Sequence, residues 1–449
     1  MVRLLQFLAL ALASLALMTR PALAQQILRD AETEAFMADM SAPLVKAAGM
    51  APNNVQVLVI NDPEINAFVA GGQYVWVHSG LIAQADNVNQ LQGVVAHELG
   101  HIEGGHIIRS GEGIKDATSV TLLSLVLGAA AIAAGGAEAG MGIMGLGQQA
   151  AMSRFLAFSR AQESSADLAG ARYLHTAGIS GRGSLEFFKK LQNQEYRLAI
   201  PQDNSYGRTH PLSGERINVL REVYAVDPAW DKPIDPQLEA RFERIKAKLI
   251  GFVSEPQQTL IKYPESDQSL PAHYARAYAW HKSAYPQKAL AEADALLAAE
   301  PHDPYFLELK GQILLESGRP ADAVAPLREA VRRTNQPLIS VLLAHALIAT
   351  EDPANFAEAE QVLRVAVQRD RENPFAWYQL GVVYERRGDT PRAALATAER
   401  YAMMGDHNLA LRSADVAVQG LKPGTVDYLR AQDIAMTSRA AVEQQRKKR

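Results

Sequence analysis

The sequence predicts an α+β domain, mostly helical with a small sheet, followed by an all-α solenoid of paired helices. Short apolar runs with strand character precede long helical stretches in the first half of the chain. From about residue 270 the chain becomes alanine-rich, helical and periodic. At 449 residues it is also too long for one ordinary domain, so at least two domains are expected.

The first 24 residues are typical of a secretory signal peptide. Arg3 supplies a positive charge, residues 4–18 form an apolar core, and Ala22-Leu23-Ala24 is a cleavage site of small residues. We expect cleavage after Ala24, with an uncleaved anchor as the alternative. Because the sequence contains no cysteine, we expect neither a lipid anchor nor a disulfide bond.

Two strands are predicted at residues 55–60 and 73–78, separated by Gly71 and Gly72. The second run alternates in character. A strand at the edge of a sheet can pair with the backbone of an extended peptide, which would let many sequences bind. Trp76 suits either such an edge or the plain core of a sheet, and the sequence leaves both open.

The next helix carries the run His97-Glu98-Leu99-Gly100-His101. Residues four apart lie about 40° apart around a helix, so both imidazoles point the same way. Residues 87–96 lead into the run with helical periodicity, and the histidines lie mostly away from the apolar stripe. Two neutral imidazoles on one face can hold a zinc ion. Glu98 is then placed to take a proton from a bound water molecule.

A catalytic zinc ion needs a third protein ligand and one open position. His106 would lie about 180° around the helix from His97, so we interpret it as a structural or supporting histidine. Glu163 is the better candidate, because residues 159–174 read as a helix with Glu163 and Asp167 on one face. Asp167 could accept an N–H from a ligating imidazole. The alternative is an exposed acidic helix face.

An apolar segment separates these two helices. Residues 120–137 are almost continuously apolar, and residues 140–147 are rich in glycine and methionine. The length approaches a bilayer span, but alanine and glycine insert weakly, and Lys115 and Glu138 flank the apolar run. Residues 118–147 are therefore predicted to form a buried or membrane-touching helical hairpin rather than a true span.

The motifs carry a family resemblance. His-Glu-x-x-His, the later Glu-x-x-x-Asp, and Arg208-Thr209-His210-Pro211 followed by Arg216 resemble the HtpX/CAAX-protease superfamily of gluzincin metallopeptidases. The likeness is to its exported, repeat-bearing form and covers nearly the whole mature chain. It implies a zincin-type metallopeptidase domain over residues 25–255.

The resemblance also implies roles for single residues. One zinc ion per chain would be held by His97, His101 and Glu163, and Glu98 would be the general base. His210 matches a histidine that can occupy the open metal position and act as a switch.

Two further positions match recurrent residues near the catalytic centre of the family, namely Arg216 and Asn66. From the residues alone, plainer interpretations stay open. His210 would be a loop residue before a proline, Arg216 a partner in a surface ion pair, and Asn66 a turn residue.

Residues 270–449 are predicted to form a tetratricopeptide (TPR) solenoid. An offset of 70 residues aligns Gly311 with Gly381 and Ala323 with Ala393, which is about two units of this repeat. We expect four or five helix pairs, the first near residues 273–299. Such stacking forms a concave groove for extended partners, whereas a generic solenoid without a ligand is the alternative. The proline-rich residues 227–236 and a helix over residues 238–253 would join the two domains.

The resemblance implies a zinc endopeptidase and chaperone of the bacterial periplasm. Its clients would be unfolded or stalled outer-membrane β-barrel proteins, and its partner the complex that assembles them, with peripheral membrane contact possible. The net charge of −4 gives no reason to expect nucleic-acid binding. The rival hypothesis is a chaperone or scaffold for outer-membrane assembly with a largely closed, inactive metal site. Glu98 and an open metal position distinguish the two.

Overall fold

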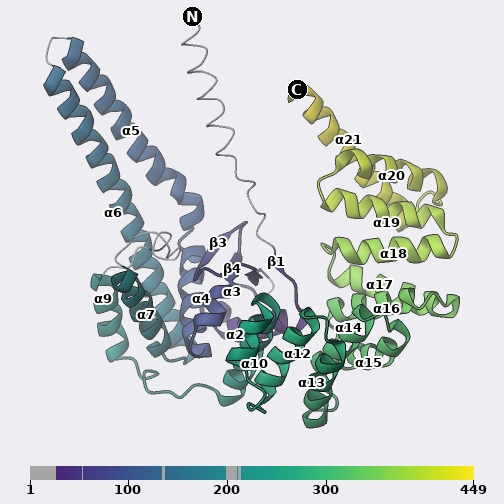
Figure 1. Ribbon diagram of the computed structural model, residues 1–449. Helices are drawn as coiled ribbons and strands as arrows, with labels where there is room; N and C mark the ends of the chain where they lie inside the picture. Colours follow the sequence, from purple (N-terminus) through teal and green to yellow (C-terminus); the bar gives the residue numbers. More distant parts are fainter. Residues whose placement is uncertain (1–26, 53, 134–136, 199–209, 211–213, 449) are drawn as a thin grey trace, which may run out of the picture.

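The computed structural model describes residues 27–52, 54–133, 137–198, 210 and 214–448 (Figure 1). The predicted signal peptide, its cleavage site at Ala24 and the residues on either side of His210 lie outside the described residues. The predicted fold class is confirmed: a mostly helical domain with a small sheet precedes a stack of paired helices.

The sheet has four strands in the order β1-β2-β4-β3. Their bounds are β1 (Ile27–Leu28), β2 (Gln56–Ile60), β3 (Ala67–Ala70) and β4 (Tyr74–His78). β2 and β4 pair in parallel, while β1 and β3 are antiparallel to their neighbours. The two predicted strands therefore exist as β2 and β4.

The structure decides between the edge and the core of the sheet, the two interpretations left open for the strand at residues 73–78. β4 lies inside the sheet between β2 and β3, so it has no free edge, and the edge toward the metal-site helix is β3. Gly71 and Gly72 make the turn between β3 and β4, and their φ angles of 69° and 101° favour glycine. The Trp76 indole N–H donates to the Ala70 carbonyl at 3.3 Å across this hairpin, which gives it a role within the sheet.

Helices surround the sheet in the first domain (Figure 1). They are α2 (Ala31–Ala47), α3 (Ser79–Gln84), α4 (Val88–Glu103), α5 (His106–Ala133), α6 (Ala137–Ala177), α7 (Arg182–Leu198), α9 (Gly214–Ala225) and α10 (Pro236–Val253). α4 begins after Asn87, whose side chain accepts the Gln90 N–H at 3.0 Å and caps the helix. Residues 88–101 of α4 are all buried, so the helix carrying the two histidines runs through the core.

Two glycines let α4 and α6 pack closely. A Cβ atom on Gly100 would lie 2.6 Å from the Ala166 carbonyl oxygen, and one on Gly170 would lie 3.0 Å from the His97 nitrogen. Only glycine fits at such a crossing without displacing backbone. This close approach brings the side chains of α6 next to the histidines of α4.

The helix of the metal motif ends earlier than the sequence suggested. Gly104 caps α4, Gly105 adopts a φ of 59°, and a new helix, α5, begins at His106. The helical-wheel argument that placed His106 opposite His97 is therefore wrong, because the two histidines lie on different helices.

α5 and α6 form a hairpin that projects away from the rest of the domain (Figure 1). The helices meet closely at Ser124 and Gly147, because a Cβ atom on Gly147 would lie 1.9 Å from the Ser124 side chain. The prediction of a helical hairpin agrees with this arrangement, but the buried alternative is wrong, because Leu122, Leu123 and Val126 are 58–66% exposed. In the described part of the chain, no helix has both the length and the apolar character that crossing a membrane requires.

The second domain is a stack of helix pairs. After α11 (Pro256–Lys262) come α12 (Leu270–Lys282), α13 (Pro286–Ala299), α14 (Pro304–Glu316), α15 (Pro320–Arg333), α16 (Pro337–Ala349), α17 (Phe356–Arg369), α18 (Pro374–Arg386), α19 (Thr390–Met403), α20 (His407–Gly420) and α21 (Val426–Lys448). The repeat at an offset of 70 residues is visible in the turns, since Gly318 and Gly388 both adopt a φ of 76°. Residues 270–448 thus contain five pairs, at the upper end of the prediction.

α10 belongs to the core of the first domain and also contacts the solenoid. Phe242, Ile245 and Leu249 are buried in that core. On its other side, Arg244 forms ion pairs with Glu32 at 2.5 Å and with Asp303 at 2.8 Å. α10 is therefore the structural link that residues 238–253 were expected to provide.

Candidate metal centre

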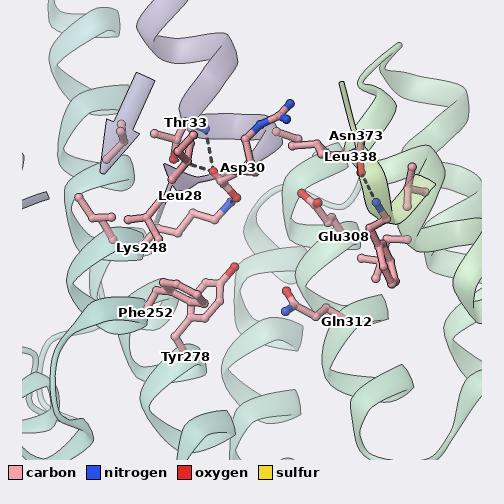
Figure 2. Close-up of a pocket in the computed structure, with 18 of the residues that line it drawn as sticks. Leu28, Asp30, Thr33, Lys248, Phe252, Tyr278, Glu308, Gln312, Leu338 and Asn373 are labelled. Atoms are coloured by element: carbon pink, nitrogen blue, oxygen red, sulfur yellow. Dashed lines mark hydrogen bonds and ion pairs between the residues drawn. The ribbon is translucent and has the colours of Figure 1, made fainter. Parts of the chain in front are cut away.

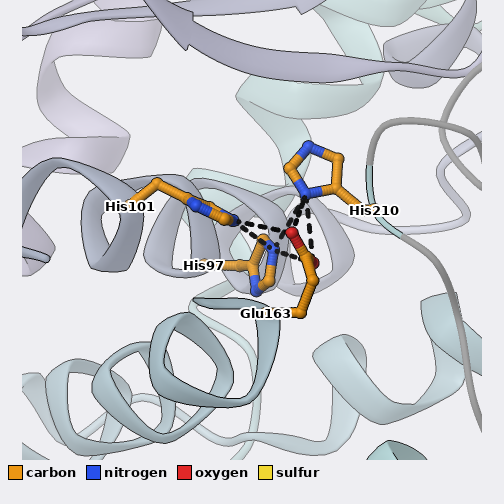
Figure 3. A group of neighbouring side chains, drawn as sticks. All are labelled: His97, His101, Glu163 and His210. Atoms are coloured by element: carbon orange, nitrogen blue, oxygen red, sulfur yellow. Dashed lines mark hydrogen bonds and ion pairs between the residues drawn. The ribbon is translucent and has the colours of Figure 1, made fainter. Parts of the chain in front are cut away.

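Four buried side chains direct ligand atoms at one point (Figure 3). His97 and His101 come from α4, Glu163 from α6, and His210 from a residue between α7 and α9. Each is at most 8% exposed. The four-residue spacing on α4 turns both imidazoles to one side, and the close packing of α6 supplies the carboxylate.

The ligand atoms of these four residues all lie within 4.8 Å of one another, and several of their separations are close to those of a metal site. His97 Nε2 lies 3.1 Å from His101 Nε2, 3.3 Å from His210 Nδ1 and 3.4 Å from Glu163 Oε2. Glu163 Oε1 lies 3.4 Å from His101 Nε2 and 3.2 Å from His210 Nδ1. A tetrahedral zinc ion with bonds of about 2.0–2.1 Å places its ligand atoms about 3.3 Å apart. The donor set and its dimensions therefore fit a divalent metal ion such as zinc.

A buried chain of charges orients the first histidine. Asp167 Oδ1 lies 2.9 Å from His97 Nδ1, on the side of the ring away from the centre. Arg216 donates two hydrogen bonds to the Asp167 carboxylate, at 2.6 and 2.8 Å, and its third nitrogen lies 3.1 Å from Glu163 Oε2. This arrangement fixes the tautomer that turns His97 Nε2 toward the centre. Arg216 and Asp167 thus both lie beside the site.

The second histidine has a comparable neighbour. His106 Nδ1 lies 2.9 Å from His101 Nδ1, so the ring at the start of α5 supports a ligand of α4. Among the described residues, His106 is not part of the group whose ligand atoms converge. The supporting role predicted for it matches this contact, although the helical-wheel argument behind the prediction does not hold.

Glu98 is fully buried beside the centre. Among the described residues, neither oxygen of its carboxylate has a hydrogen-bond partner, and its nearest charged neighbour is His210 Nε2 at 3.5 Å. Burial raises the pKa of this carboxyl above its ordinary value. A buried acceptor without a donor beside four converging ligand atoms fits a site built to receive a metal ion and water.

The edge strand of the sheet borders the centre. His210 Nε2 lies 3.2 Å from the Ala67 carbonyl oxygen at the start of β3. Asn66 precedes this residue, is 6% exposed, and accepts the His78 N–H on its carbonyl at 2.9 Å. Asn66 therefore lies one residue from a direct contact of His210, at the edge where an extended peptide could pair.

The ionisation of these groups is strongly shifted. Burial lowers the pKa of His97, but hydrogen bonds to Asp167 and Glu163 outweigh it and raise this pKa to about 10. Burial, with the neighbouring His97, lowers the pKa of His101 to about 2. Burial opposes ionisation of Glu163, but hydrogen bonds with His210 and His97 lower its pKa. One buried carboxylate surrounded by imidazoles is the charge pattern that a bound cation would complete.

One contact of the centre was not predicted from the sequence. The Phe188 ring of α7 meets the His97 ring edge-on at 5.9 Å, and the Arg216 guanidinium lies 5.6 Å from the same Phe188 ring. Phe188 is 1% exposed and closes the apolar side of the site. In the sequence it is one apolar residue on a helix, with no local signal that links it to a motif about ninety residues earlier.

Comparison with known families agrees with this geometry. Residues 28–224 match the model of peptidase family M48, and residues 285–336 and 343–408 match tetratricopeptide repeat models. The first domain is therefore similar to M48 peptidases and the second to TPR repeats, and the curated proteins that the chain resembles include metalloproteases.

Particular relatives share one or both parts. The beta-barrel assembly-enhancing protease of Escherichia coli K12 is 25% identical over 394 residues, which are 86% of this chain and 79% of that protein. Metalloprotease LoiP of the same organism is 30% identical over 39% of this chain and 64% of its own length. A solved structure titled YrrB, a TPR protein with an unusual peptide-binding site, covers 40% of this chain and 94% of its own, with 20% identity and a TM-score of 0.32.

Proposed function

We propose that this protein is a zinc-dependent endopeptidase that acts on outer-membrane β-barrel proteins during their assembly. The observation that carries the proposal is the convergence of ligand atoms from His97, His101, Glu163 and His210 within 4.8 Å of one another, beside Glu98, whose carboxylate has no hydrogen-bond partner among the described residues. The likeness to beta-barrel assembly-enhancing proteases over most of both chains supports the choice of client.

The residues divide the chemistry between them. His97, His101 and Glu163 would hold one zinc ion, which when bound polarises a carbonyl group and lowers the pKa of a water molecule. Glu98 takes the proton of the attacking water and returns it to the leaving amine. Asp167 and Arg216 hold His97 in position, and β3 offers its edge to the backbone of an extended client.

His210 sets the resting state in this proposal. Its Nδ1 atom lies at ligand distance from His97 and Glu163, where it fills the fourth position and excludes the nucleophilic water. The same observation favours the second candidate function, a chaperone or scaffold for outer-membrane assembly whose metal site stays closed. A movable His210 distinguishes the protease from the scaffold.

The cellular setting is part of the proposal. An apolar N-terminal segment and a cleavage site after Ala24 in the sequence support export to the periplasm. The TPR repeats would bind clients or the β-barrel assembly complex, and the exposed α5–α6 hairpin would make peripheral contact with a membrane.

The test is Glu98→Gln in the full-length chain, which keeps size and burial but removes the base. We expect cleavage of an unfolded β-barrel client to fall by at least a hundredfold, with zinc content unchanged. Client fragments are measured by gel electrophoresis and zinc by mass spectrometry. Glu103→Gln, at an exposed position at the end of the same helix, is the matched control and should keep activity.

Two results would contradict the proposal. Full cleavage by Glu98→Gln would show that another group is the base, and loss of zinc would show that Glu98 is itself a ligand. A wild-type chain that binds zinc and clients but cleaves none of them would favour the scaffold.

A further inference from the structure

A second cavity lies where the solenoid meets the first domain (Figure 2). Its volume is about 560 Å³, within the range of ligand-binding pockets. One wall comes from β1, the start of α2, and α10. The other comes from α12, α14, α16 and the start of α18, which are the first helices of four successive pairs. None of the four candidate metal ligands lines it.

Both walls of the cavity combine apolar side chains with polar ones, and one carboxylate oxygen of Glu308 lacks a partner in the described part of the chain. The polar lining residues besides Glu308 include Arg29, Asp30, Thr33, Lys248, Gln312 and Asn373. Glu308 of α14 points into the space between the Asp30–Lys248 pair and Gln312 (Figure 2). Among the described residues, its Oε2 atom is inaccessible to solvent and has no hydrogen-bond partner. The apolar lining is supplied by Leu249, Phe252, Leu338, Val341, Leu342 and Phe375.

The nearby cations are already engaged by other carboxylates. Lys248 lies 2.5 Å from Asp30 and 3.2 Å from Glu32. Arg244 lies 2.5 Å from Glu32 and 2.8 Å from Asp303. Arg29, which also lines the cavity, pairs with Glu34 and Asp370. The carboxylates around the cavity therefore outnumber the cations.

The excess of carboxylates over cations agrees with the shifted pKa of Glu308. Burial, together with the negative charges of Asp30, Glu32 and Asp303, raises its pKa to about 8 against the opposing effect of Lys248. A buried acid that is this reluctant to ionise lacks a counter-charge. A ligand with a positive group would supply one.

We propose that this cavity binds a peptide segment in which a basic side chain is flanked by apolar residues, with the basic group paired to Glu308. The apolar side chains of both walls fit the flanking residues. The first helices of stacked repeats form the concave surface on which such proteins bind extended partners. The site does not depend on peptidase chemistry, so it stands or falls separately from the proposed function.

The test uses the full-length chain with Glu98→Gln, which prevents cleavage of the probe. Three blocked, fluorescein-labelled pentapeptides are compared by fluorescence anisotropy: Val-Leu-Lys-Leu-Val, and the same peptide with norleucine or glutamate at the centre. We expect the lysine peptide to bind at least tenfold more tightly than the norleucine peptide, and the glutamate peptide to bind most weakly.

Variants locate the binding. Adding Glu308→Gln should remove the preference for lysine over norleucine and leave the norleucine affinity unchanged. Glu329→Gln, at a half-buried position of the neighbouring α15 where the carboxylate pairs with His302 outside the cavity lining, should keep the preference. Leu342→Trp replaces a leucine of the cavity wall with a larger, aromatic side chain. It should weaken the binding of all three peptides.

Several outcomes would overturn the proposal. They are equal binding of lysine and norleucine peptides, a preference for lysine that survives Glu308→Gln, and binding that Leu342→Trp leaves unchanged. If Glu308→Gln does not fold, the comparison of the three peptides and the Leu342→Trp result decide the question.

Discussion

At the residue scale, the proposed switch of the metal centre is His210. Its ring contacts His97 and Glu163 through one nitrogen, and Ala67 and Glu98 through the other. Because His210 belongs to neither α4 nor α6, its ring could leave the centre without moving either helix. The helices would then keep a three-ligand site with an open position, as catalytic zinc requires.

We therefore predict that His210→Ala raises basal cleavage of an unfolded client several-fold and increases self-cleavage. The reason is that the fourth position opens to water while His97, His101 and Glu163 remain. Initial rates are measured with zinc-loaded protein, and His175→Ala, at an exposed ring of the same domain, is the control. Reduced cleavage with zinc retained would show instead that His210 assists the reaction.

Glu308 gives a second prediction at this scale, for stability against pH. Its pKa is raised to about 8 in the folded protein by burial, while in the unfolded chain it lies near the ordinary 4.5. Between these values the folded state keeps a proton that the unfolded state releases, so stability is lost as pH rises from about 4.5 to about 8. Glu308→Gln should remove this contribution.

The measurement is urea unfolding of both proteins at pH 5, 6.5 and 8. The free energy of unfolding of Glu308→Gln should increase relative to that of the wild type as pH rises. That of Glu329→Gln should change with pH as the wild type does. A constant difference across the pH range would show that Glu308 already has a counter-charge in the free protein.

At the scale of elements, the α5–α6 hairpin stands out, because its exposed surface is apolar. Between residues 117 and 153 the only charged residue is Glu138, and Asp116 and Arg154 flank this stretch. Leu122 and Leu123 are adjacent in the sequence and both are exposed. The exposed apolar side chains of α5 therefore do not form one narrow stripe along the helix. A surface that is apolar on several sides suits lipid better than one protein groove.

We predict that the full-length protein co-sediments with vesicles of phosphatidylethanolamine and phosphatidylglycerol. Exchanging Leu123 and Val126 together for glutamine should weaken binding by about 3 kcal/mol, roughly a hundredfold, because two exposed apolar side chains no longer enter the lipid. Leu168→Gln changes an exposed leucine of α6 near its other end and should have no effect. Unchanged binding by the double variant would exclude the hairpin as the contact.

Elements also show how far the sequence could predict this molecule. α4 and its two histidines could be predicted because the spacing that creates the site is local to one helix. The strands β1 and β3 are two and four residues long, too short to leave a periodic signal, and β1 is part of the second cavity. The break at Gly105 was missed because a single glycine inside a helical pattern is often tolerated.

Long-range contacts were the least predictable from local patterns. His210 and Arg216 were proposed only through family resemblance, since no local pattern ties them to α4. Glu308 was not singled out at all. It is one glutamate on a repeat helix, and its raised pKa arises from burial and from negative charges that include Asp30 and Glu32 of the other domain.

At the scale of the whole molecule, one buried network joins the two domains. Arg244 of α10 bridges Glu32 of the first domain and Asp303 of the solenoid, and its guanidinium lies 3.9 Å from the Phe306 ring. The Tyr274 hydroxyl of α12 also donates to Glu32 at 2.7 Å. These contacts hold the wall of the second cavity in place relative to the peptidase domain.

Arg244→Met should therefore destabilise the protein by about 3–5 kcal/mol, because it leaves Glu32 and Asp303 as buried acids without their shared partner. Unfolding in urea, followed by circular dichroism, should also separate into two transitions as the domains lose their coupling. Arg241→Met removes an exposed arginine one turn away that pairs with Asp39, and should change stability by about 1 kcal/mol or less. Equal, small effects of the two variants would show that the domains are held by apolar packing of α10 and not by the charged network.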